Sequence, residues 1–572
     1  MKIRNNRFLV LAAFTSAAIV SSARAQFIKA DNSTSLTMAG SWTTEGVPTS
    51  TDVITFDNTL SLASRTAALG GNLSVLGINA TAAPVSGVTR QWQISNTPGA
   101  TLTIGASGIT KASNTSPFII ASALTLGANQ TWTLNSVTGT GTGNLQINGA
   151  FTDGGNTLAV NGAGTLDLRG SNTFGSNVTI DSTVSVNNAA ATVTLGGANT
   201  MNLLSVPSGR VIGATLNNFG VASNFGDGGT NTAISLGNNT TNGVMEYSGV
   251  TATSNRTVNR DGRSAASGIE VSTIHETLTI SGNLGSGNQV NTGNSGWVFG
   301  GAGNLTLNGV ISNSSGAGST GTTITKYGSG VLTLGSSTNT FSGAITVTSG
   351  KLSIASNGNV NSSSGITIGT ASTAASSEFN YNASTALSKS VVFAAGSTGG
   401  VLSGTGTINQ AVSITTGNTL AIGNSSGTMS FADTLGLSGA IVMEIDGAAG
   451  AGLAGGHDFA NLTGSGAAGV LTYGGSMTLD IGAVFGEGSH SWDLFNMASK
   501  TGTFSAIALA DKYSGSLLDS DFDGVWDLSS GDNTWQFNES TGVLGLTVIP
   551  EPSAAALVGS LGMLTLLRRR RA

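Results

Sequence analysis

Residues 326–354, KYGSGVLTLGSSTNTFSGAITVTSGKLSI, decide the fold, because this stretch holds in one line a pattern that most of the chain repeats. It contains three short apolar pairs, each with Thr or Ser between its members: Leu332 and Leu334, Ile345 and Val347, Leu352 and Ile354. Alternate side chains of a strand point to the same face, so each pair predicts a short strand with one inward face. The Gly, Ser and Asn residues between the pairs favour tight turns.

A second copy of the pattern occupies residues 162–186, GAGTLDLRGSNTFGSNVTIDSTVSV, with apolar pairs at nearly the same offsets. The Gly-x-Gly element that opens it returns at Gly141, Gly301 and Gly404. Strands this short cannot bury a core alone, whereas a stack of them encloses a continuous apolar interior. The repetition therefore predicts a parallel β-solenoid.

Residues 326–354 resemble the autotransporter-associated β-strand repeat of bacterial surface proteins. We expect an all-β fold, with a right-handed parallel β-helix over residues 26–400. From residue 401 the sequence resembles the closing part of the same family, so residues 401–549 are expected to be β-rich and to end the solenoid or form a sandwich-like cap. A signal peptide and a short C-terminal anchor helix flank these two regions.

Trp42 belongs to a Trp, Pro and Asp pattern with which members of the resembling family often begin. The first turn of a solenoid has an open apolar end, and a bulky aromatic side chain can cover it. The alternative is an exposed Trp that stacks on carbohydrate. The same two interpretations apply to Trp92 and Trp132.

The composition excludes several classes of protein. Charged residues make up only 9% of the 572 residues, 84 residues are Gly, and Cys is absent, so disulfides and Cys metal sites are excluded. The hydrophobic fraction of 39% favours an ordered chain over a disordered one. Eight of the 22 basic residues lie at the two ends, which leaves an acidic body that is poorly suited to bind nucleic acid.

Residues 1–25 have the three parts of a secretory signal peptide. A basic start precedes an apolar run from Phe8 to Val20, and Ala23 and Ala25 form a small-x-small cleavage site. We therefore expect export by the Sec translocon, followed by cleavage by signal peptidase after Ala25.

The C-terminus carries Pro550, Glu551 and Pro552, then the mostly apolar residues 553–567, then Arg568–Arg571. This order closely resembles the PEP-CTERM sorting signal, and an ordinary tail anchor is the alternative. The resemblance implies recognition by an exosortase, cleavage near the Pro-Glu-Pro motif, and delivery to the cell surface or extracellular matrix. The apolar run is shorter than an ordinary span, so we expect only transient insertion into the inner membrane.

Residues 247–276 are the most charged part of the body. They could line a groove that binds an extracellular polysaccharide, or they could form a solvated loop and an edge strand. The candidate groove residues are Arg256, Arg260, Arg263, Glu270 and His275.

Asp519, Asp521 and Asp523 precede Gly524 in a D-x-D-x-D-G pattern. Alternate carboxylates in a tight loop can converge on calcium, so the three residues are candidate Ca²⁺ ligands. The interpretation that we favour is a solvated acidic turn, and we therefore expect no cofactor. The position that holds Glu in an EF-hand loop is Ser530, and no flanking helices are expected.

The sequence offers no catalytic arrangement. His275, His457 and His490 are scattered, and their spacing supports neither a zinc site nor a Ser-His-Asp triad. We therefore expect a non-enzymatic, exported surface or matrix protein that acts as a structural or adhesin-like scaffold. The alternatives are a secreted carbohydrate-active β-helix enzyme, either a lyase or a glycosidase, and a glycan-binding protein.

Overall fold

The structure of the protein is a computed structural model. It describes residues 26–57, 66–81, 92–112, 117–135, 144–161, 165–168, 172–173, 178–180, 192–195, 204–206, 209–227, 233–237, 241–260, 267–286, 295–313, 321–371, 376–423, 425–549 and 562–563.

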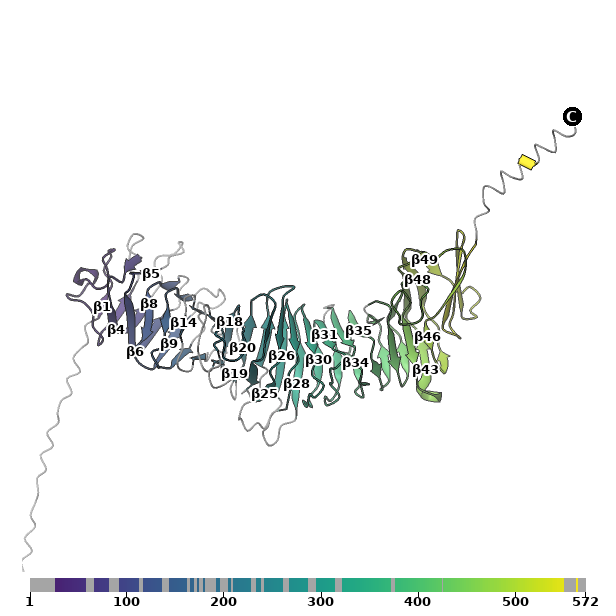
Figure 1. The fold of residues 1–572 in the computed structure, drawn as a ribbon, viewed down its shortest axis with the longest axis horizontal. Helices are drawn as coiled ribbons and strands as arrows, with labels where there is room; N and C mark the ends of the chain where they lie inside the picture. Colours follow the sequence, from purple (N-terminus) through teal and green to yellow (C-terminus); the bar gives the residue numbers. More distant parts are fainter. Residues whose placement is uncertain are drawn as a thin grey trace, which may run out of the picture.

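These residues form a parallel β-solenoid whose turns are stacked along the long axis of an elongated molecule (Figure 1). Strands of successive turns pair in parallel and build long sheets, which we call the first, second and third walls. The solenoid prediction is confirmed.

The first wall consists of β1 Phe27–Ile28, β2 Val53–Phe56, β4 Leu73–Ala80, β6 Thr101–Lys111, β9 Gln130–Leu134, β12 Leu158–Asn161, β15 Val178–Ile180, β17 Leu204–Val206, β19 Ala233–Leu236, β22 Thr257–Arg260 and β25 Leu284–Ser286, with β8 Ala123–Leu126, β11 Phe151–Thr152 and β14 Asn172–Thr173 beside this path. The second wall consists of β3 Thr66–Ala68, β5 Trp92–Ser95, β7 Phe118–Ile120, β10 Asn144–Ile147, β13 Thr165–Leu168, β16 Thr192–Leu195, β18 Gly209–Gly213, β20 Gly243–Tyr247, β23 Ser267–Val271, β26 Ser295–Gly301, β28 Thr322–Lys326, β30 Ile345–Val347, β32 Ile366–Ile368 and β34 Val391–Phe393. The third wall consists of β21 Ala252–Ser254, β24 Thr277–Ile280, β27 Asn304–Leu307, β29 Val331–Leu334, β31 Gly350–Ile354, β33 Ser377–Tyr381, β35 Gly400–Gly404, β38 Thr419–Ile422, β41 Ala440–Ile445, β44 Ser476–Ile481, β48 Ala506–Asp511 and β49 Gly515–Leu517.

The repeat unit at 326–354 forms the three strands that its apolar pairs predict. β29 and β31 are neighbours in the third wall, where Leu332 lies beside Leu352, and Leu334 lies beside Ile354. β30 belongs to the second wall. These apolar side chains are buried, while Thr333 on the opposite face is half-buried. A buried Leu or Ile contributes about 1.5–3 kcal/mol relative to an exposed one, so each turn is stabilised by the apolar stripe it shares with its neighbours.

The turn before β31 depends on Gly350. Its φ of 66° lies in the left-handed region, and an added Cβ would lie 2.2 Å from the carbonyl oxygen of Gly328 in the preceding turn. Only glycine satisfies both conditions without strain. The turn before β31 therefore requires glycine at position 350 as strictly as the strands require apolar residues at their inward positions.

Near residue 401 the walls change but the solenoid continues. The second wall ends at β34, while the third wall runs on through β35 to β48. Two four-stranded parallel sheets join it, namely β36 Thr407–Ile408, β39 Thr428–Phe431, β42 Phe459–Leu462 and β46 Phe495–Asn496, and β37 Val412–Ile414, β40 Leu435–Leu437, β43 Val470–Tyr473 and β47 Ser499–Thr501. Most of the region expected at 401–549 therefore consists of further parallel turns.

An antiparallel sheet, which we call the end sheet, lies at the C-terminal end of the solenoid, and one of its strands comes before β46, β47 and β48 in the chain. Its order is β45 Gly488–Asp493, β52 Val543–Val548, β51 Asn533–Asn538 and β50 Val525–Ser530, and β49 also pairs antiparallel with β48. The sheet contributes the buried side chains of Trp492, Trp535 and Phe537 to the core. The described part of residues 401–549 thus holds further parallel turns and an antiparallel sheet, and the sandwich-like cap stays a prediction.

At the other end, Trp42 closes the first turn as predicted. Its side chain is buried, its indole N–H donates to the carbonyl oxygen of Leu36 at 2.9 Å, and its ring meets Phe27 edge-on at 6.1 Å. Trp92 and Trp132 are also buried. None of the three is available to stack on a carbohydrate.

In the part of the chain that the structure describes, two short 3₁₀ turns, η1 Ala39–Ser41 and η3 Gly466–Gly469, interrupt the strands. The predicted signal peptide, 1–25, lies outside the described residues, as does nearly all of the predicted anchor. Among the residues that are described, no helix is both long and apolar enough to cross a bilayer.

Candidate functional site

The predicted processing positions cannot be compared with the structure. Ala23 and Ala25 of the cleavage site, and Pro550, Glu551 and Pro552 of the sorting motif, lie outside the described residues. They stay predictions from the sequence.

Two residues of the predicted glycan groove point into the solenoid instead. Arg256 and Arg260 are both fully buried. Arg256 Nη1 donates to the carbonyl oxygen of Gly226 at 3.0 Å, and the guanidinium carbon of Arg260 lies 5.9 Å from the ring centroid of the buried Trp297. An arginine packed against an indole gains cation–π attraction in a desolvated site. These two side chains therefore serve the interior and do not face a ligand in solvent.

The third groove residue, Glu270, belongs to a polar network on the outer face of the second wall. Arg210 donates to Glu270 Oε1 at 2.9 Å and to Glu246 Oε2 at 2.7 Å, while the Tyr327 hydroxyl also donates to Glu270. Burial alone would raise the pKa of Glu270, but the hydrogen bonds from Arg210 and Tyr327 outweigh it and lower that pKa. The carboxylate is held ionised by two side chains that lie two turns away, Arg210 on one side and Tyr327 on the other.

The remaining two groove residues lie elsewhere. His275 is exposed in a turn with a φ of 66°, and Arg263 lies outside the described residues. The four described members of the predicted groove are thus divided between the interior, the outer face of the second wall and a turn. The structure does not bring them together into one site.

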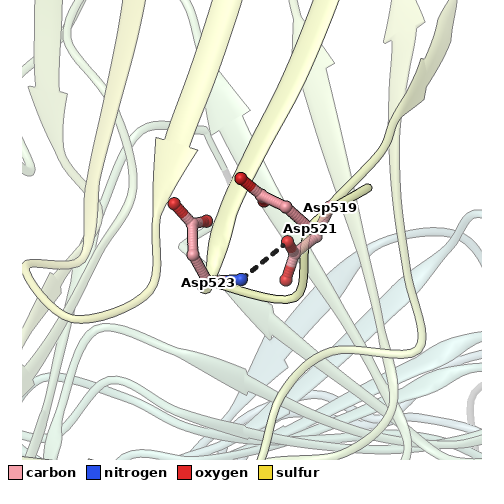
Figure 2. A group of neighbouring side chains, drawn as sticks. All are labelled: Asp519, Asp521 and Asp523. Atoms are coloured by element: carbon pink, nitrogen blue, oxygen red, sulfur yellow. Dashed lines mark hydrogen bonds between the residues drawn. The ribbon is translucent and has the colours of Figure 1, made fainter.

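The acidic loop between β49 and β50 does bring its three carboxylates together (Figure 2). Single oxygens of Asp519, Asp521 and Asp523 lie within 4.8 Å of one another. The loop also uses them internally, because Asp519 accepts hydrogen bonds from the backbone N–H groups of Asp523 and Gly524, both at 3.1 Å. Asp523 accepts the N–H of Val525 at 2.8 Å.

This donor set fits part of a calcium shell. Ca²⁺ takes six to eight oxygen ligands, and three carboxylates with free lone pairs supply some of them. Asp527, a further candidate ligand, instead accepts a hydrogen bond from Gln536 at 3.0 Å on the end sheet. Water or backbone oxygens would have to complete the shell, so calcium binding stays a hypothesis.

A cavity of about 430 Å³ lies beside the acidic loop. Such a volume is within the range of small-ligand sites. It is bounded by β47 and the segment after it, by the β49–β50 loop and by β50, and its lining includes Lys500, Thr503, Asp519, Phe522, Trp526 and Glu539.

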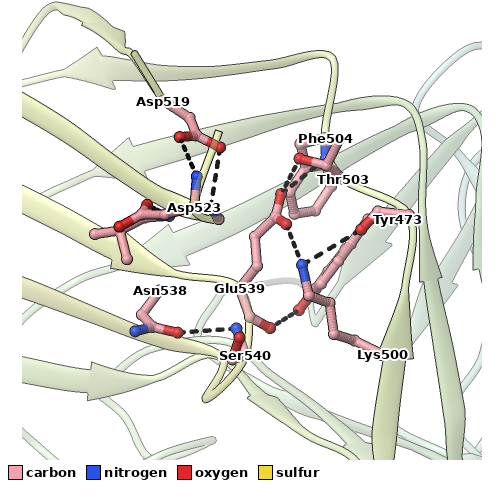
Figure 3. A network of polar contacts seen from close by, with 12 residues as sticks. Tyr473, Lys500, Thr503, Phe504, Asp519, Asp523, Asn538, Glu539 and Ser540 are labelled. Carbon is pink, nitrogen blue, oxygen red and sulfur yellow. Dashed lines mark hydrogen bonds and ion pairs between the residues drawn. The ribbon is translucent and has the colours of Figure 1, made fainter. Parts of the chain in front are cut away.

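Glu539 lines the cavity and is the centre of a polar network that we call the cavity floor (Figure 3). Its side chain is fully buried, and Oε1 accepts hydrogen bonds from the Thr503 hydroxyl at 2.8 Å, the Phe504 N–H at 2.9 Å and the Trp526 indole N–H at 3.0 Å. Lys500 Nζ pairs with Oε2 at 2.7 Å. Because every buried charge here has a partner, the floor is a rigid network.

The aromatic side chain of Tyr473 packs against this network and stabilises it. The Lys500 ammonium lies 5.9 Å from the ring centroid of Tyr473, whose hydroxyl donates to the Glu539 backbone carbonyl at 3.3 Å. Burial, together with the charge of Glu539, raises the pKa of Tyr473 well above its usual range. The Tyr473 hydroxyl therefore stays protonated and keeps the proton that it donates to the Glu539 carbonyl.

Phe522 stands at the rim of the cavity. Phe522 is 89% exposed, and its φ of 60° lies in the left-handed region. The sequence analysis did not identify Phe522, Lys500 or Glu539 as site residues. Lys500 and Glu539 are distant in the sequence, so no local spacing could have indicated their pairing.

No protein-family model matches the chain, and no curated protein matches it. The resemblances to the autotransporter-associated repeat and to the PEP-CTERM signal therefore stay predictions. The fold and the site define the class: an all-β parallel solenoid closed by an antiparallel sheet, with a ligand-sized cavity beside that sheet.

Proposed function

We propose that the protein is an exported, exosortase-processed surface or extracellular-matrix protein that serves as a non-enzymatic structural or adhesive scaffold. One observation carries the proposal: a single apolar core extends from Phe27 in the first strand to Leu546 in the last one. A chain that buries one core along one long stack is a rod, and a rod is suited to spacing and display. We also propose that the solenoid is right-handed, the hand of nearly all parallel crossovers.

The sequence signals at the two ends support the proposed route. The signal peptide at 1–25 would take the chain through the Sec translocon to signal peptidase, and the Pro-Glu-Pro motif would present it to an exosortase while the apolar run is inserted in the inner membrane. Release would leave the rod at the cell surface or in the matrix, in contact with extracellular polysaccharide.

A carbohydrate-cleaving activity has less support. Such enzymes place carboxylates or basic groups together in an open groove. The arginines that the sequence offers for this purpose, Arg256 and Arg260, are buried in the solenoid. This placement favours a scaffold over a lyase or a glycosidase.

Cell fractionation combined with mass spectrometry of both mature termini tests the proposal. We expect the protein in the surface or matrix fraction, beginning at Gln26 and lacking the residues that follow the Pro-Glu-Pro motif. Glu551→Ala should keep the tail and stay in the membrane fraction, whereas Glu487→Ala, at an exposed position before the end sheet, should be processed normally. A cytoplasmic location, or a surface form that retains residues 550–572, would contradict the proposal.

A further inference from the structure

The cavity beside the end sheet has the composition of a site for an uncharged ligand. Lys500 contributes a positive charge, and Asp519, Asp523 and the buried Glu539 contribute negative charges, within one hollow of about 430 Å³. An anionic ligand would meet the carboxylates, and a cationic ligand would meet the ammonium group of Lys500. A neutral ligand that carries hydroxyl groups can donate hydrogen bonds to the carboxylates and accept them from the ammonium group of Lys500.

The floor of the cavity leaves polar capacity for such a ligand. Lys500 Nζ donates to Glu539 at 2.7 Å and to the Gly502 carbonyl at 3.4 Å, and an ammonium group has three protons. Asp523 uses one carboxylate oxygen for the Val525 N–H, and its other oxygen remains able to accept. Because Glu539 holds Lys500 in place, the free donor is already oriented before a ligand arrives.

Phe522 supplies the apolar surface. An 89% exposed Phe buries little and so adds little to the core, and the left-handed conformation is strained for a residue that has a side chain. The fold therefore gains nothing from Phe522 that a small polar residue would not supply. An aromatic ring beside hydroxyl-binding groups is suited to a ligand with one apolar face.

We propose that this cavity binds a neutral pyranose glycan. The ring of Phe522 stacks on the C–H face of a sugar, while Lys500 and Asp523 hydrogen-bond its hydroxyl groups. The proposal does not require calcium, because the groups that contact the sugar are side chains of the chain itself. It goes beyond the scaffold function by giving the C-terminal end of the rod a polysaccharide partner, and it stands even if export and processing follow another route.

Titration calorimetry on the purified full chain, in the presence of EDTA, tests the proposal. The probes are cellohexaose, a hexamer of N-acetylglucosamine, a galacturonate hexamer and an oligolysine. We expect at least one of the two neutral hexamers to bind, and both charged probes to bind more weakly. Phe522→Ala should weaken the binding about tenfold or more, because an aromatic platform typically contributes that much to stacking.

Two variants separate stacking from folding. Phe522→Tyr keeps the ring and should keep the affinity, whereas Leu518→Ala removes another exposed apolar side chain of the same loop and should leave it unchanged. All variants should retain the melting temperature of the natural chain. Failure of both neutral hexamers to bind at up to about 10 mM, tighter binding of either charged probe, or an unchanged affinity in Phe522→Ala would overturn the proposal. Binding that appears only after calcium is added would also overturn it.

Discussion

The body of the solenoid and its C-terminal end are stabilised in different ways. In the body, equivalent apolar side chains of successive turns lie beside one another, as Leu307, Leu334 and Ile354 do in the third wall. At the end, the strands turn antiparallel and the core is closed by aromatic residues such as Trp492 and Trp535, whose rings stack at 6.1 Å. A periodic stack can be extended turn by turn, but its last turn has no successor. The end therefore needs side chains that do not repeat.

Buried charges show the same contrast. In the body, Lys326 Nζ donates to the backbone carbonyls of Tyr327 and Gly328 at 2.8 Å and of Ser349 at 3.1 Å, and burial lowers the pKa of Lys326 to about 8. At the end, Glu539 depends on four donors, three of which are side chains. Lys326 is thus satisfied by backbone carbonyls alone, whereas Glu539 is satisfied mainly by side chains brought from separate strands.

The strongest test of this contrast removes the centre of the end network. Glu539→Ala leaves Lys500, Trp526 and the Phe504 N–H without their acceptor, and breaking a buried ion pair in this way costs about 3–5 kcal/mol. We expect hydrogen exchange to show loss of protection in β50, β51 and β52, while β29 and β31 stay protected. Asp511→Ala, which breaks the exposed pair of Asp511 and Lys512, should change the stability by less than about 0.5 kcal/mol. Equal loss of protection in both regions would show that the end does not unfold separately.

The reciprocal test opens a cavity in the body. Leu334→Ala removes a fully buried side chain from the third wall and should cost about 2–5 kcal/mol, measured by hydrogen exchange on β27, β29 and β31. Thr333→Ala, on the outer side of the same strand, is the matched control and should cost much less. Because each turn contacts only its neighbours, the effect should fade along the stack. Destabilisation of the end sheet by Leu334→Ala would contradict nearest-neighbour stabilisation.

Acidity should affect the end part of the solenoid through Asp458. Its carboxylate is fully buried and accepts the backbone N–H groups of Gly427 and Glu444, both at 2.8 Å. Burial, with further contributions from the charges of Glu444 and Asp446, raises the pKa of Asp458 to about 7, against about 3.9 for an unfolded Asp. Between these values the folded state holds a proton that the unfolded state has released.

The stability contributed by Asp458 is therefore fully present below about pH 4 and is lost as the pH rises to about 7. The loss should reach about 2–4 kcal/mol, seen as falling protection of β39, β41 and β42. Asp458→Asn does not titrate and should remove this slope, at the cost of one backbone hydrogen bond. A slope that persists in Asp458→Asn would assign the titration to another group.

A smaller effect is expected at a corner of the body. Gly350→Ala forces a left-handed conformation and places a Cβ 2.2 Å from the Gly328 oxygen, so we expect a cost of about 1–3 kcal/mol by hydrogen exchange on β29 and β31. Gly99 is the matched control, since it has a φ of 77° but no atom within 4 Å of an added Cβ. Gly99→Ala should therefore show only the conformational part of the cost. Equal costs at both positions would mean that the corner tolerates the close approach.

The sequence predicts the structure where the cause of that structure is local. The alternation around Leu332 and Leu352 predicted strands and their inward faces, because period-two patterning depends only on neighbouring residues. The sequence pattern could not predict how many residues separate the strands that pair in successive turns. Leu402 pairs with Leu420, but Ile441 pairs with Met477, and twice as many residues separate the second pair.

Charged residues were the main source of error about the site. Arg256 and Arg260 were considered for a surface groove because arginine is rarely buried, yet the solenoid encloses both. In the opposite sense, Phe522 is apolar and yet is among the most exposed residues described. Burial in both cases depends on the path of the whole chain and not on the residue type.

The sequence by itself determined that this chain is a stack of short strands with glycine corners and one apolar interior, because strand alternation and turn chemistry act over a few residues. It also determined that the carboxylates of Asp519, Asp521 and Asp523 share one loop. Only the tertiary structure decided how the stack is closed, and that Lys500, Phe522 and Glu539 surround one cavity. These three residues come from different segments, and only the packing of the end sheet against the last turn brings such segments together.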